Sequence, residues 1–546
     1  MSKNLVELVR RHHALDAPTA LDVLKEAVEL RGEVTDEDRR EAATRSGLPE
    51  ATVHGVSTFY DDLLQPRGAR HVRVCTGTAC FAATGDAHVD ALRSAFGVEL
   101  GERSDDGSVS LAETVCLGFC HSSPAVRDGD VIDAGPDVVA RVLADACVPA
   151  EEPAWQSTLA EPVLTRPGDW SGLARVLADG VAPETLLEDV KAAEIRGRGG
   201  AGFPAGVKWG FARAAEGEEK FIVANGDEGD PGSYIDKYLM ERSPELLLEG
   251  MALAGYAVGA SHGFVLVRSE YPLSKPALEE AAARARADGW LGERFDVTVV
   301  EGAGSYVVGE ETALLACLQG LRGTVSARPP FPAQSGLHGM PTVVNNVETL
   351  CNVPFVAAHG ADAYRALSPG AATSGSKLVC FNERFARPGV YEVPFGVSTR
   401  WLCEELAGGL RDGRSIKALQ IGGPLGGILP AERLDTAFDF DALAAEGCML
   451  GHGGILAFDD RTSMRDVARH LLRFGAHESC GKCFPCRIGL QRAHALFAED
   501  APPIDRGRLE ALLETLELGS LCAHGGGMPA PIRSLLRWFP DELGLA

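Results

Sequence analysis

The sequence has 546 residues, and its 52 Lys and Arg residues against 77 Asp and Glu residues give a formal net charge of −25. This charge is spread along the chain and repels a phosphate backbone, so nucleic acid is not an expected partner. The N-terminus has no leader pattern and no apolar run is long enough for a bilayer. We therefore expect a multidomain cytoplasmic protein without direct membrane insertion.

Helical patterns occupy the first part of the chain. Residues 18–32 and 49–63 have helical periods, and the segment between them has Thr35 as a candidate N-cap and Gly47 as a stop signal. These signals predict an N-terminal helical bundle over residues 1–66.

A different pattern begins at residue 67. Short apolar strands alternate there with one helix at residues 86–96, which predicts a compact α/β unit over residues 67–150. Residues 149–169 hold four prolines and no clear period, so we expect an interdomain linker in this segment.

Three further regions follow the linker. Residues 165–360 alternate helices with apolar strands such as FIVAN, which indicates a sheet covered by helices. Residues 361–440 contain short strands around one helix and predict a small α+β unit. Residues 441–546 are dominated by helical patterns.

The C-terminal cysteines have a spacing typical of an iron–sulfur site. Cys480, Cys483 and Cys486 are separated by two residues each, and Cys522 lies in the next segment. Three closely spaced thiolates and a distant fourth suit a 4Fe–4S cube. The alternative is a structural zinc site, which usually takes its cysteines as two separated pairs.

A second set of cysteines lies in the N-terminal α/β unit. Cys75 and Cys80 form one pair and Cys116 and Cys120 another. Two pairs suit a 2Fe–2S rhomb because each iron needs two thiolates, although zinc is a serious rival here. The six remaining cysteines are scattered and are interpreted as buried apolar side chains, namely Cys147, Cys317, Cys351, Cys380, Cys403 and Cys448.

A glycine-rich stretch, EIRGRGGAGFPAGVKW, contains G-x-G-x-x-G at Gly197, Gly199 and Gly202. A Rossmann fingerprint should follow a strand, whereas the segment before this stretch reads as a helix, so the match alone is weak. So many glycines still allow a phosphate or a flat ring to approach the main chain, and Lys208 can supply positive charge.

Three further motifs stay ambiguous on spacing alone. The loop ANGDEGDPGSYIDK suits calcium or a solvated turn. Glu310 and Glu311 stand at a predicted helix start, where the helix dipole favours carboxylates. Asn345 and Asn346 could cap a helix or recognise a polar ring.

Taken in order, these motifs resemble the NADH-binding FMN flavoprotein subunit of respiratory complex I and its soluble relatives over about residues 165–540. The motifs are IRGRGGAGFPAGVKW, NGDEGDPGSYIDK, GAGSYVVGEETALL, RPPFPAQSGLHGMPTVVNNVETL and CGKCFPCR. The first 150 residues, through VHGVSTFY, CTGTAC and CLGFC, resemble the separate 2Fe–2S subunit of the same module. The chain thus resembles a fusion of the two, which favours 2Fe–2S over zinc.

The resemblance implies a multidomain α/β fold with a thioredoxin-like 2Fe–2S domain, a Rossmann-like FMN domain, a ubiquitin-like insert and a C-terminal four-helix 4Fe–4S bundle. It implies an FMN shell made of Gly197, Arg198, Gly199, Lys208, Asn225, Asp227, Tyr306, Glu310, Asn345, Asn346 and Thr349. It also implies dinucleotide contacts from Phe203, Phe211, Asp230, Glu311, Arg328 and Phe331. Asp230 replaces a usual glutamate and Arg328 a usual lysine, which changes reach and hydrogen-bond geometry.

The function implied is a diaphorase subunit that exchanges a hydride between NAD(H) and FMN. Single electrons would then pass through the clusters to or from other iron–sulfur and catalytic subunits. No catalytic side chain is expected, because the flavin carries the hydride. The fusion and the VRSEYP segment favour soluble NAD-dependent formate dehydrogenases and hydrogenases. The alternatives are the NADH-input subunit of complex I, an electron-bifurcating hydrogenase subunit, and a non-catalytic metal-stabilised scaffold.

Overall fold

The computed structural model describes residues 18–545, so the first 17 residues of the predicted N-terminal bundle lie outside the described part. The bundle contains α2 (Ala20–Arg31), α3 (Asp36–Ser46), α4 (Glu50–Ser57) and α5 (Asp61–Leu64). Thr35 caps α3 through a capping box and Gly47 ends it with a left-handed backbone, as predicted. Across residues 18–545, no helix is both long and apolar enough to cross a membrane.

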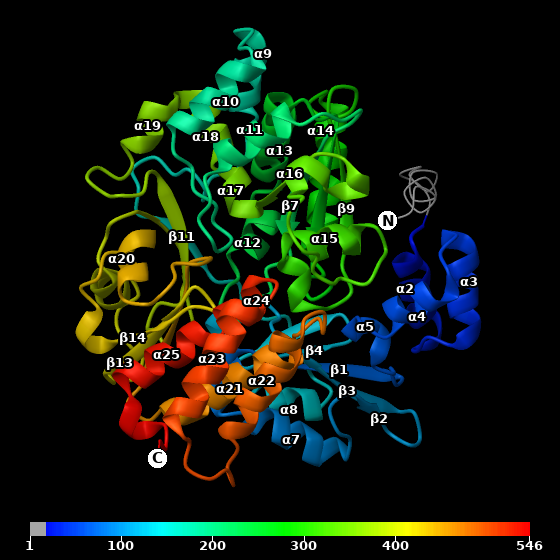
Figure 1. Cartoon of the computed structure of the whole chain (residues 1–546), viewed down its shortest axis with the longest axis vertical. Helices are drawn as coiled ribbons and strands as arrows, with labels where there is room; N and C mark the ends of the chain where they lie inside the picture. The colour runs from blue at the N-terminus through cyan, green and yellow to red at the C-terminus, as the bar shows by residue number, and fades with distance from the viewer. Residues whose placement is uncertain (1–17, 546) are drawn as a thin grey trace.

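The α/β unit that follows is built on a five-stranded sheet of order β2-β3-β1-β4-β5, in the lower right of Figure 1. Strand β1 runs parallel to β3 and antiparallel to β4. The elements are β1 (Arg70–Cys75), α6 (Thr78–Thr84), α7 (Ala87–Phe96), β2 (Glu102–Arg103), β3 (Val109–Thr114), η1 (Cys120–Ser122), β4 (Ala125–Asp128), β5 (Val131–Ala134) and α8 (Val138–Leu143). The sheet edge formed by the ends of β1 and β3 therefore carries the cysteine loops.

The predicted linker contains a strand that the sequence pattern did not reveal. Strand β6 (Ala154–Ser157) pairs in parallel with β12 (Gly389–Pro394). The buried carboxylate of Glu392 then accepts hydrogen bonds from the main-chain N–H groups of residues 163–165 at 3.0–3.2 Å. Strand pairing and these hydrogen bonds therefore hold the segment against the six-stranded sheet.

The middle of the chain forms an all-parallel sheet of order β10-β7-β8-β9, covered by helices as predicted. Its strands are β7 (Phe221–Gly226), β8 (His262–Val267), β9 (Asp296–Glu301) and β10 (Thr342–Asn346). Its helical elements are α9 (Ser171–Ala178), α10 (Pro183–Ala192), α11 (Ala205–Ala214), α12 (Ile235–Arg242), α13 (Pro244–Val258), α14 (Ser274–Ala287), η2 (Tyr306–Gly309), α15 (Glu311–Leu318), α16 (Pro332–Ser335), η3 (Leu337–Gly339), α17 (Val347–Cys351), α18 (Val353–His359) and α19 (Ala361–Arg365). The carboxyl ends of parallel strands meet at one edge, where ligands bind in open α/β sheets.

A six-stranded mixed sheet of order β14-β13-β15-β11-β12-β6 lies on the left of Figure 1. It contains β11 (Ser376–Phe381), β13 (Ile416–Ile421), β14 (Ile428–Pro430) and β15 (Gly454–Asp459), with the π-helix η4 (Trp401–Leu406), the 3₁₀ turn η5 (Ala431–Arg433) and α20 (Phe440–Ala445) beside them. Strand β15 pairs with β11 and β13, so this sheet extends past residue 440 into the region that the sequence assigned to helices.

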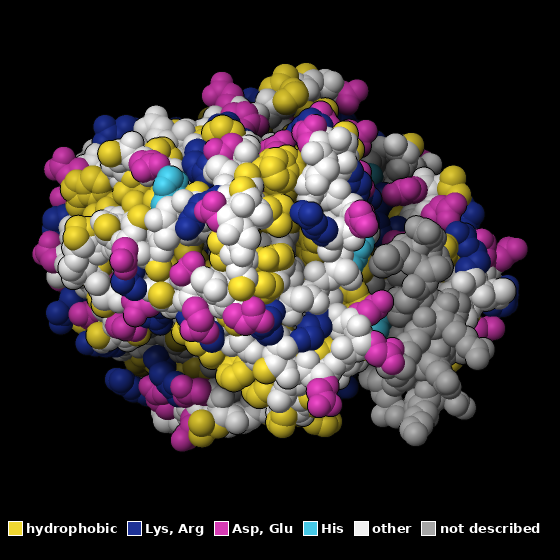
Figure 2. Space-filling model, turned by 90° about the horizontal axis from the view of Figure 1, so that it is seen from above, with side chains coloured by type: hydrophobic (Ala, Val, Ile, Leu, Met, Phe, Trp, Pro, Cys, Tyr) yellow, Lys and Arg dark blue, Asp and Glu magenta, His cyan; other side chains and the backbone are white. Residues whose placement is uncertain are grey.

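The C-terminal region is helical, with α21 (Met464–His477), α22 (Phe484–Leu496), α23 (Arg506–Gly519), α24 (Ala523–Gly527), α25 (Pro529–Trp538) and η6 (Pro540–Glu542). Its core, which includes Leu471, Leu490 and Leu513, is shared with Ala82 of α6. The N-terminal cysteine unit and the C-terminal bundle therefore pack against each other. Figure 2 shows acidic and basic side chains interspersed over one face of the molecule, without a field of a single sign.

Candidate cofactor and electron-transfer sites

The glycine-rich stretch forms a tight loop between α10 and α11. The N–H of Gly197 donates to the carbonyl of Phe203 at 2.9 Å, and Arg196 forms a β-bridge with Pro204. The preceding element is the helix α10, as the sequence indicated, so this is not a Rossmann fingerprint. A Cβ on Gly199 would lie 2.9 Å from Cβ of Asn346, so only glycine lets the loop approach β10 this closely.

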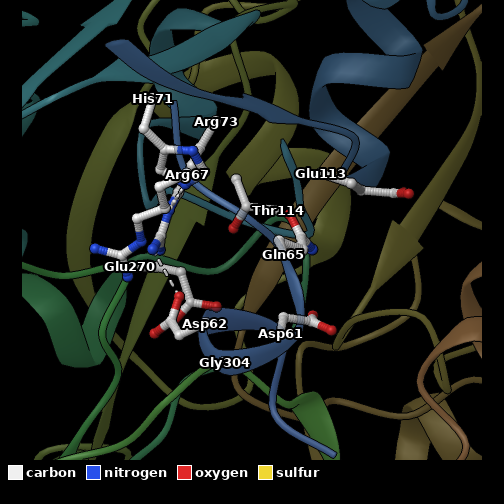
Figure 3. A pocket seen from close by; sticks show the side chains of 10 residues that line it. All are labelled: Asp61, Asp62, Gln65, Arg67, His71, Arg73, Glu113, Thr114, Glu270 and Gly304. Carbon is white, nitrogen blue, oxygen red and sulfur yellow. Dashed lines mark hydrogen bonds and ion pairs between the residues drawn. The ribbon is translucent and has the colours of Figure 1, made fainter. Parts of the chain in front are cut away.

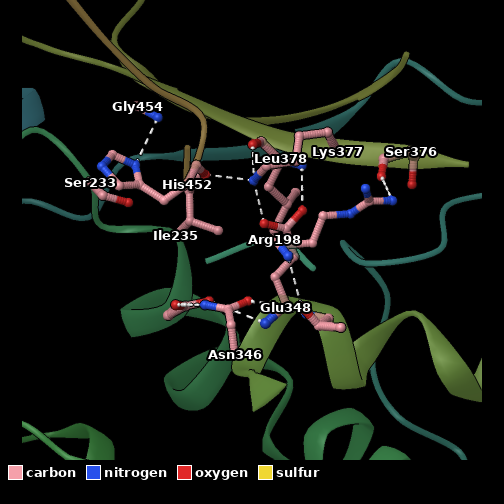
Figure 4. Close-up of polar contacts among 12 residues, drawn as sticks. Arg198, Ser233, Ile235, Asn346, Glu348, Ser376, Lys377, Leu378, His452 and Gly454 are labelled. Atoms are coloured by element: carbon pink, nitrogen blue, oxygen red, sulfur yellow. Dashed lines mark hydrogen bonds and ion pairs between the residues drawn. The ribbon is translucent and has the colours of Figure 1, made fainter. Parts of the chain in front are cut away.

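Arg198 is fully buried beneath this loop. Its Nη2 donates to the Ser376 carbonyl at 3.1 Å (Figure 4). The same nitrogen donates to the Tyr364 hydroxyl at 2.9 Å. Its main-chain N–H donates to Thr349 Oγ1 at 2.8 Å. Nε and Nη1 have no hydrogen-bond partner among the described residues. A buried guanidinium with two open donors fits an anionic group such as a flavin phosphate.

The asparagine pair at the end of β10 is divided between two tasks. Asn345 Oδ1 accepts from Trp209 Nε1 at 2.8 Å. Asn346 caps α17, because its Oδ1 accepts from the Thr349 N–H at 3.2 Å, and its amide donates to Asp236. Of the two possibilities that the sequence left open, capping is realised by Asn346.

The acidic loop after β7 is folded back on itself. The carboxylate of Glu228 accepts the main-chain N–H groups of residues 235–237 at 2.8–3.1 Å and so anchors α12. Asn225 donates to the Gly309 carbonyl at 2.8 Å. The side chain of Asp227 is 8% exposed and that of Asp230 is 23% exposed. Desolvation raises the pKa of Asp227 to about 8 and that of Asp230 to about 7. The loop therefore presents two carboxyl groups whose pKa values are raised towards neutral pH.

The two adjacent glutamates at the start of α15 have different surroundings. Glu310 is the N-cap, with its carboxylate accepting from the N–H groups of Thr312 and Ala313. Glu311 pairs with Arg328 at 2.8 Å and with Lys208 at 3.3 Å. Lys208 also donates to the Val344 carbonyl at 2.9 Å, which links the glycine loop to β10.

Three aromatic side chains near these motifs face solvent. Phe203, Phe211 and Phe331 are 48%, 59% and 52% exposed. Large exposed apolar side chains are informative where they gather, and a planar ligand ring is one partner they suit. All three belong to the set that the resemblance implied for the dinucleotide.

The four N-terminal cysteines all lie at one end of their sheet and are buried. Cys75 ends β1, Cys80 lies in α6, and the sulfurs of Cys116 and Cys120 are 3.7 Å apart. Cys80 interacts with Cys75, and Cys120 with Cys116 and both members of the other pair. Two facing pairs of buried thiols fit a 2Fe–2S rhomb.

The C-terminal cysteines gather between α21, α22 and α24. Cys480, Cys483 and Cys522 all interact with Cys486, whose sulfur lies 3.1 Å from Ser479 Oγ. Cys480 and Cys486 are buried, whereas Cys483 and Cys522 are partly exposed. This convergence of four thiols fits a 4Fe–4S cube. Next to it, Phe484 is 80% and Leu518 78% exposed.

The other cysteines behave as the sequence predicted. Five of the six are buried and Cys147 is half-buried. Cys351 and Cys380 belong to the central hydrophobic core, and Cys403 and Cys448 to the core of the six-stranded sheet. Cys317 packs in the core that the bundle shares with the parallel sheet.

A polar pocket lies where the N-terminal bundle, the five-stranded sheet and the parallel-sheet unit meet (Figure 3). Asp62 and Arg73 form an ion pair of 2.7 Å across it, and the N–H of Asp61 donates to the Gly304 carbonyl at 3.1 Å. None of the sequence-predicted site residues lines this pocket. It joins the N-terminal units to the loop that leads into Tyr306.

Sequence reasoning missed several residues beside the glycine loop. Gly200 forms a β-bridge with Gly451, and this bridge brings His452 into the site. The His452 carbonyl accepts from Lys377, which is buried and paired with Glu348 (Figure 4). The only available signal was the glycine-rich stretch LGHGG, which indicates close backbone approach.

Comparisons with known proteins agree with this geometry. A model described as the Nuo51 FMN-binding domain matches residues 190–355. A model of thioredoxin-like [2Fe-2S] ferredoxin matches residues 6–145, and the NADH-ubiquinone oxidoreductase-F iron-sulfur binding region matches residues 466–545. Fold and site thus define a flavoprotein with two iron–sulfur regions in one chain.

Similar full-length proteins narrow this class. The NADH-quinone oxidoreductase F 2 subunit of Rhizobium meliloti (strain 1021) is 40% identical over 69% of this chain and 91% of the relative. The NADP-reducing hydrogenase subunit HndC of Solidesulfovibrio fructosivorans is 42% identical over 68% of this chain and 78% of the relative. The chain belongs to the family of NADH-quinone oxidoreductase F subunits.

A solved structure extends the likeness over nearly the whole chain. The crystal structure of an NAD+-reducing [NiFe]-hydrogenase in the H2-reduced state superposes with a TM-score of 0.87 at 32% identity. The match covers 97% of this chain and 93% of that chain. The expected multidomain fold is thereby confirmed.

Proposed function

We propose that this chain is the diaphorase subunit of a soluble NAD-dependent hydrogenase or formate dehydrogenase. It exchanges a hydride between NAD(H) and FMN and relays single electrons through iron–sulfur clusters to or from a partner. The observation that carries the proposal is that one fold gathers the glycine loop over Arg198 and both sets of four converging cysteines. Use of the NAD(H) pool supports a cytoplasmic location.

The FMN site that we propose is built around the glycine loop. Arg198 would meet the anionic end of FMN with its two open N–H donors. The remaining polar shell is Gly197, Gly199, Lys208, Asn225, Asp227, Tyr306, Glu310, Asn345, Asn346 and Thr349. Bound FMN would supply the capacity to take two electrons as hydride and part with them singly. The protein groups hold the ring in place and set its environment.

For the dinucleotide we propose the solvent-facing side of the same loop. Phe203, Phe211 and Phe331 would contact its rings, and Glu311 would accept a hydrogen bond from the adenosine ribose. Asp230 and Arg328 complete the set. Glu311 is held in place by Lys208 and Arg328, which fixes a carboxylate at a defined point of the site.

For the clusters we propose Cys75, Cys80, Cys116 and Cys120 as 2Fe–2S ligands and Cys480, Cys483, Cys486 and Cys522 as 4Fe–4S ligands. The partial exposure of Cys483 and Cys522 supports an exit towards a partner protein at the C-terminal site.

The second candidate is the NADH-input subunit of complex I, supported by several relatives that are NADH-quinone oxidoreductase F subunits. By sequence, these relatives and the hydrogenase subunit HndC match the same share of this chain, 68–69%. The structural match to the NAD+-reducing hydrogenase chain covers 97% of this chain, and this match supports the hydrogenase-type assembly.

The test is to purify the chain with FMN and clusters assembled. We expect NADH oxidation with an artificial acceptor and no turnover of formate or hydrogen, because none of its motifs provides a molybdenum or nickel–iron site. Formate or hydrogen turnover by the single chain would refute the proposal, as would the lack of flavin and iron–sulfur absorbance.

A further inference from the structure

This inference rests on the proposed function and concerns a proton. Oxidation of NADH to NAD+ yields two electrons and one proton, and iron–sulfur clusters take up only the electrons. One proton must therefore leave the site for each NADH oxidised, and one must enter when NAD+ is reduced. A carboxylate beside the proposed flavin site can take up this proton and pass it to solvent.

The partly exposed carboxyl group of Asp230 is a candidate for this task. Its Oδ1 accepts a hydrogen bond from the Tyr306 hydroxyl at 2.7 Å, and its Oδ2 lies 3.3 Å from His452 Nε2. A Cβ on Gly423 would be 2.8 Å from both Asp230 Cγ and His452 Nε2, so Gly423 packs closely against both side chains. Tyr306 and Asp230 both belong to the proposed cofactor site, whereas His452 is a new neighbour.

His452 is held in one orientation and one tautomer. Its Nδ1 accepts the N–H of Gly454 at 3.0 Å, so the ring proton resides on Nε2, which has no hydrogen-bond partner among the described residues. Its carbonyl accepts from Lys377 (Figure 4). The preceding Gly451 forms a β-bridge with Gly200 of the glycine loop. Burial and the Lys377 charge lower the pKa of His452 to about 3, so the ring stays neutral.

The charged groups around Asp230 explain why it can switch state. Burial is the main cause that raises its pKa, to about 7, and the Glu228 charge adds to this rise. The Tyr306 hydrogen bond and the Arg268 charge act in the opposite direction. Asp227 is a second buried carboxyl group close enough to interact with Asp230. Asp230 is therefore poised between its two forms near neutral pH.

We propose that Asp230 accepts the proton released by NADH oxidation and returns it during NAD+ reduction, and that Tyr306 positions the Asp230 carboxylate through its hydroxyl. In the forward direction the C4–H bond of NADH breaks and its electron pair leaves as hydride. The two electrons depart through the clusters, and the remaining proton forms an O–H bond on the Asp230 carboxylate. This assigns an acid–base role where the sequence predicted none.

The first test is the midpoint potential of bound FMN against pH, from about pH 5 to 9, a range that spans the pKa of Asp230. Coupling of Asp230 to the flavin gives the parent a change of slope near pH 7. Asp230→Asn should remove this change. Tyr306→Phe removes the O–H donor from the carboxylate, which raises the pKa of Asp230 and moves the change of slope to higher pH.

The matched control is Glu249→Gln. Glu249 is also buried, and burial raises its pKa to about 7, but it caps the start of α9 through the Leu173 N–H at 3.0 Å and lies outside the cofactor motifs. This variant should keep the parental slope change. FMN content and cluster absorbance establish that every variant is folded and loaded.

A second readout is kcat for NADH with an artificial acceptor against pH. The parental kcat should rise through the Asp230 titration, because only the carboxylate accepts a proton, and Asp230→Asn should flatten the profile with KM changed little. A slope change and kcat profile that survive in Asp230→Asn would overturn the inference while leaving the diaphorase function intact. A parent chain without FMN-dependent NADH oxidation would instead refute the function itself.

Discussion

The two cysteine sites differ most in how they meet solvent. All four cysteines of the N-terminal site are buried, and α6, which carries Cys80, packs against the C-terminal bundle. The C-terminal site has Cys483 and Cys522 partly exposed and a border of apolar side chains. Electron transfer falls steeply with distance, so a cluster that meets a partner needs an open edge. This difference in exposure supports the proposed exit of electrons at the C-terminal site.

The largest effect is expected for Cys483→Ala, which removes a proposed ligand at the open edge. NADH oxidation with an artificial acceptor should persist, while reduction of the partner should fall by a factor on the order of 100, at the upper end of losses at disrupted metal sites. Stopped-flow measurement of both reactions checks this. Cys403→Ala, in the core of the six-stranded sheet, is the control for loss of a buried thiol. If the variant lacks the 4Fe–4S cluster but still reduces the partner at the parental rate, the proposed difference in role between the two cysteine sites is wrong.

Glu311→Gln tests whether dinucleotide selection is independent of electron delivery to the partner protein. A carboxylate repels the 2′-phosphate of NADPH, and its removal also frees Lys208 and Arg328 to attract that phosphate. The kcat/KM ratio of NADH over NADPH should fall on the order of tenfold, corresponding to about 1.4 kcal/mol. Partner reduction driven by NADH at saturation should keep its rate. An unchanged ratio with FMN fully bound would remove Glu311 from dinucleotide selection.

Phe484→Ser tests whether the partner protein docks at the exposed side of the C-terminal cysteine site. Phe484 lies between two proposed ligands and is mostly solvent-exposed, so its loss should leave the cluster intact. Loss of an interface aromatic costs about 1–2 kcal/mol, so KM for the partner should rise roughly 5- to 30-fold at unchanged flavin reduction. Leu30→Ser on the N-terminal bundle is the matched control for an exposed apolar residue. Equal effects of both variants would contradict a specific docking edge.

The smallest effect on delivery is expected for Cys80→Ala. This variant should lose the N-terminal cluster, and electron paramagnetic resonance measures that loss. The rate of partner reduction should stay within about twofold of the parental rate, well below a tenfold change, which corresponds to about 1.4 kcal/mol. A collapse of partner reduction comparable to that of Cys483→Ala would place both sites on one obligatory path.

Local signals predicted the parts of the fold that depend on neighbouring residues. Thr35 and Gly47 bound α3 because capping and the left-handed turn need only adjacent backbone. The cysteine spacing predicted both clusters of thiols for the same reason. Strand β6 was missed because its pairing with β12 joins residues more than 200 positions apart. His452 was missed likewise, because the Gly200–Gly451 bridge alone brings it to the glycine loop.

The roles of single polar residues were harder to predict than their presence. Glu310 and Asn346 stand in motifs that the resemblance linked to FMN, yet in the fold each also caps a helix. One side chain can both cap a helix and contact a ligand, and the sequence alone does not show which of these interactions it makes. Substitution of either residue would therefore change helix stability together with cofactor affinity, whereas Nε and Nη1 of Arg198 have no hydrogen-bond partner within residues 18–545.

The strand β6 has a consequence for how the two parts of this fusion stay together. It adds a parallel edge to β12, where Gly389 leaves room for Ala154, and Glu392 holds the residues that follow. Main-chain pairing of this kind does not require a continuous chain, since extended segments add to sheet edges between separate polypeptides. If the chain were cut after Thr165, the N-terminal product would retain both β6 and the segment bound by Glu392. Strand β6 would then pair with β12 between two polypeptides. A split gene could therefore yield two chains that associate through contacts already present in the fused chain.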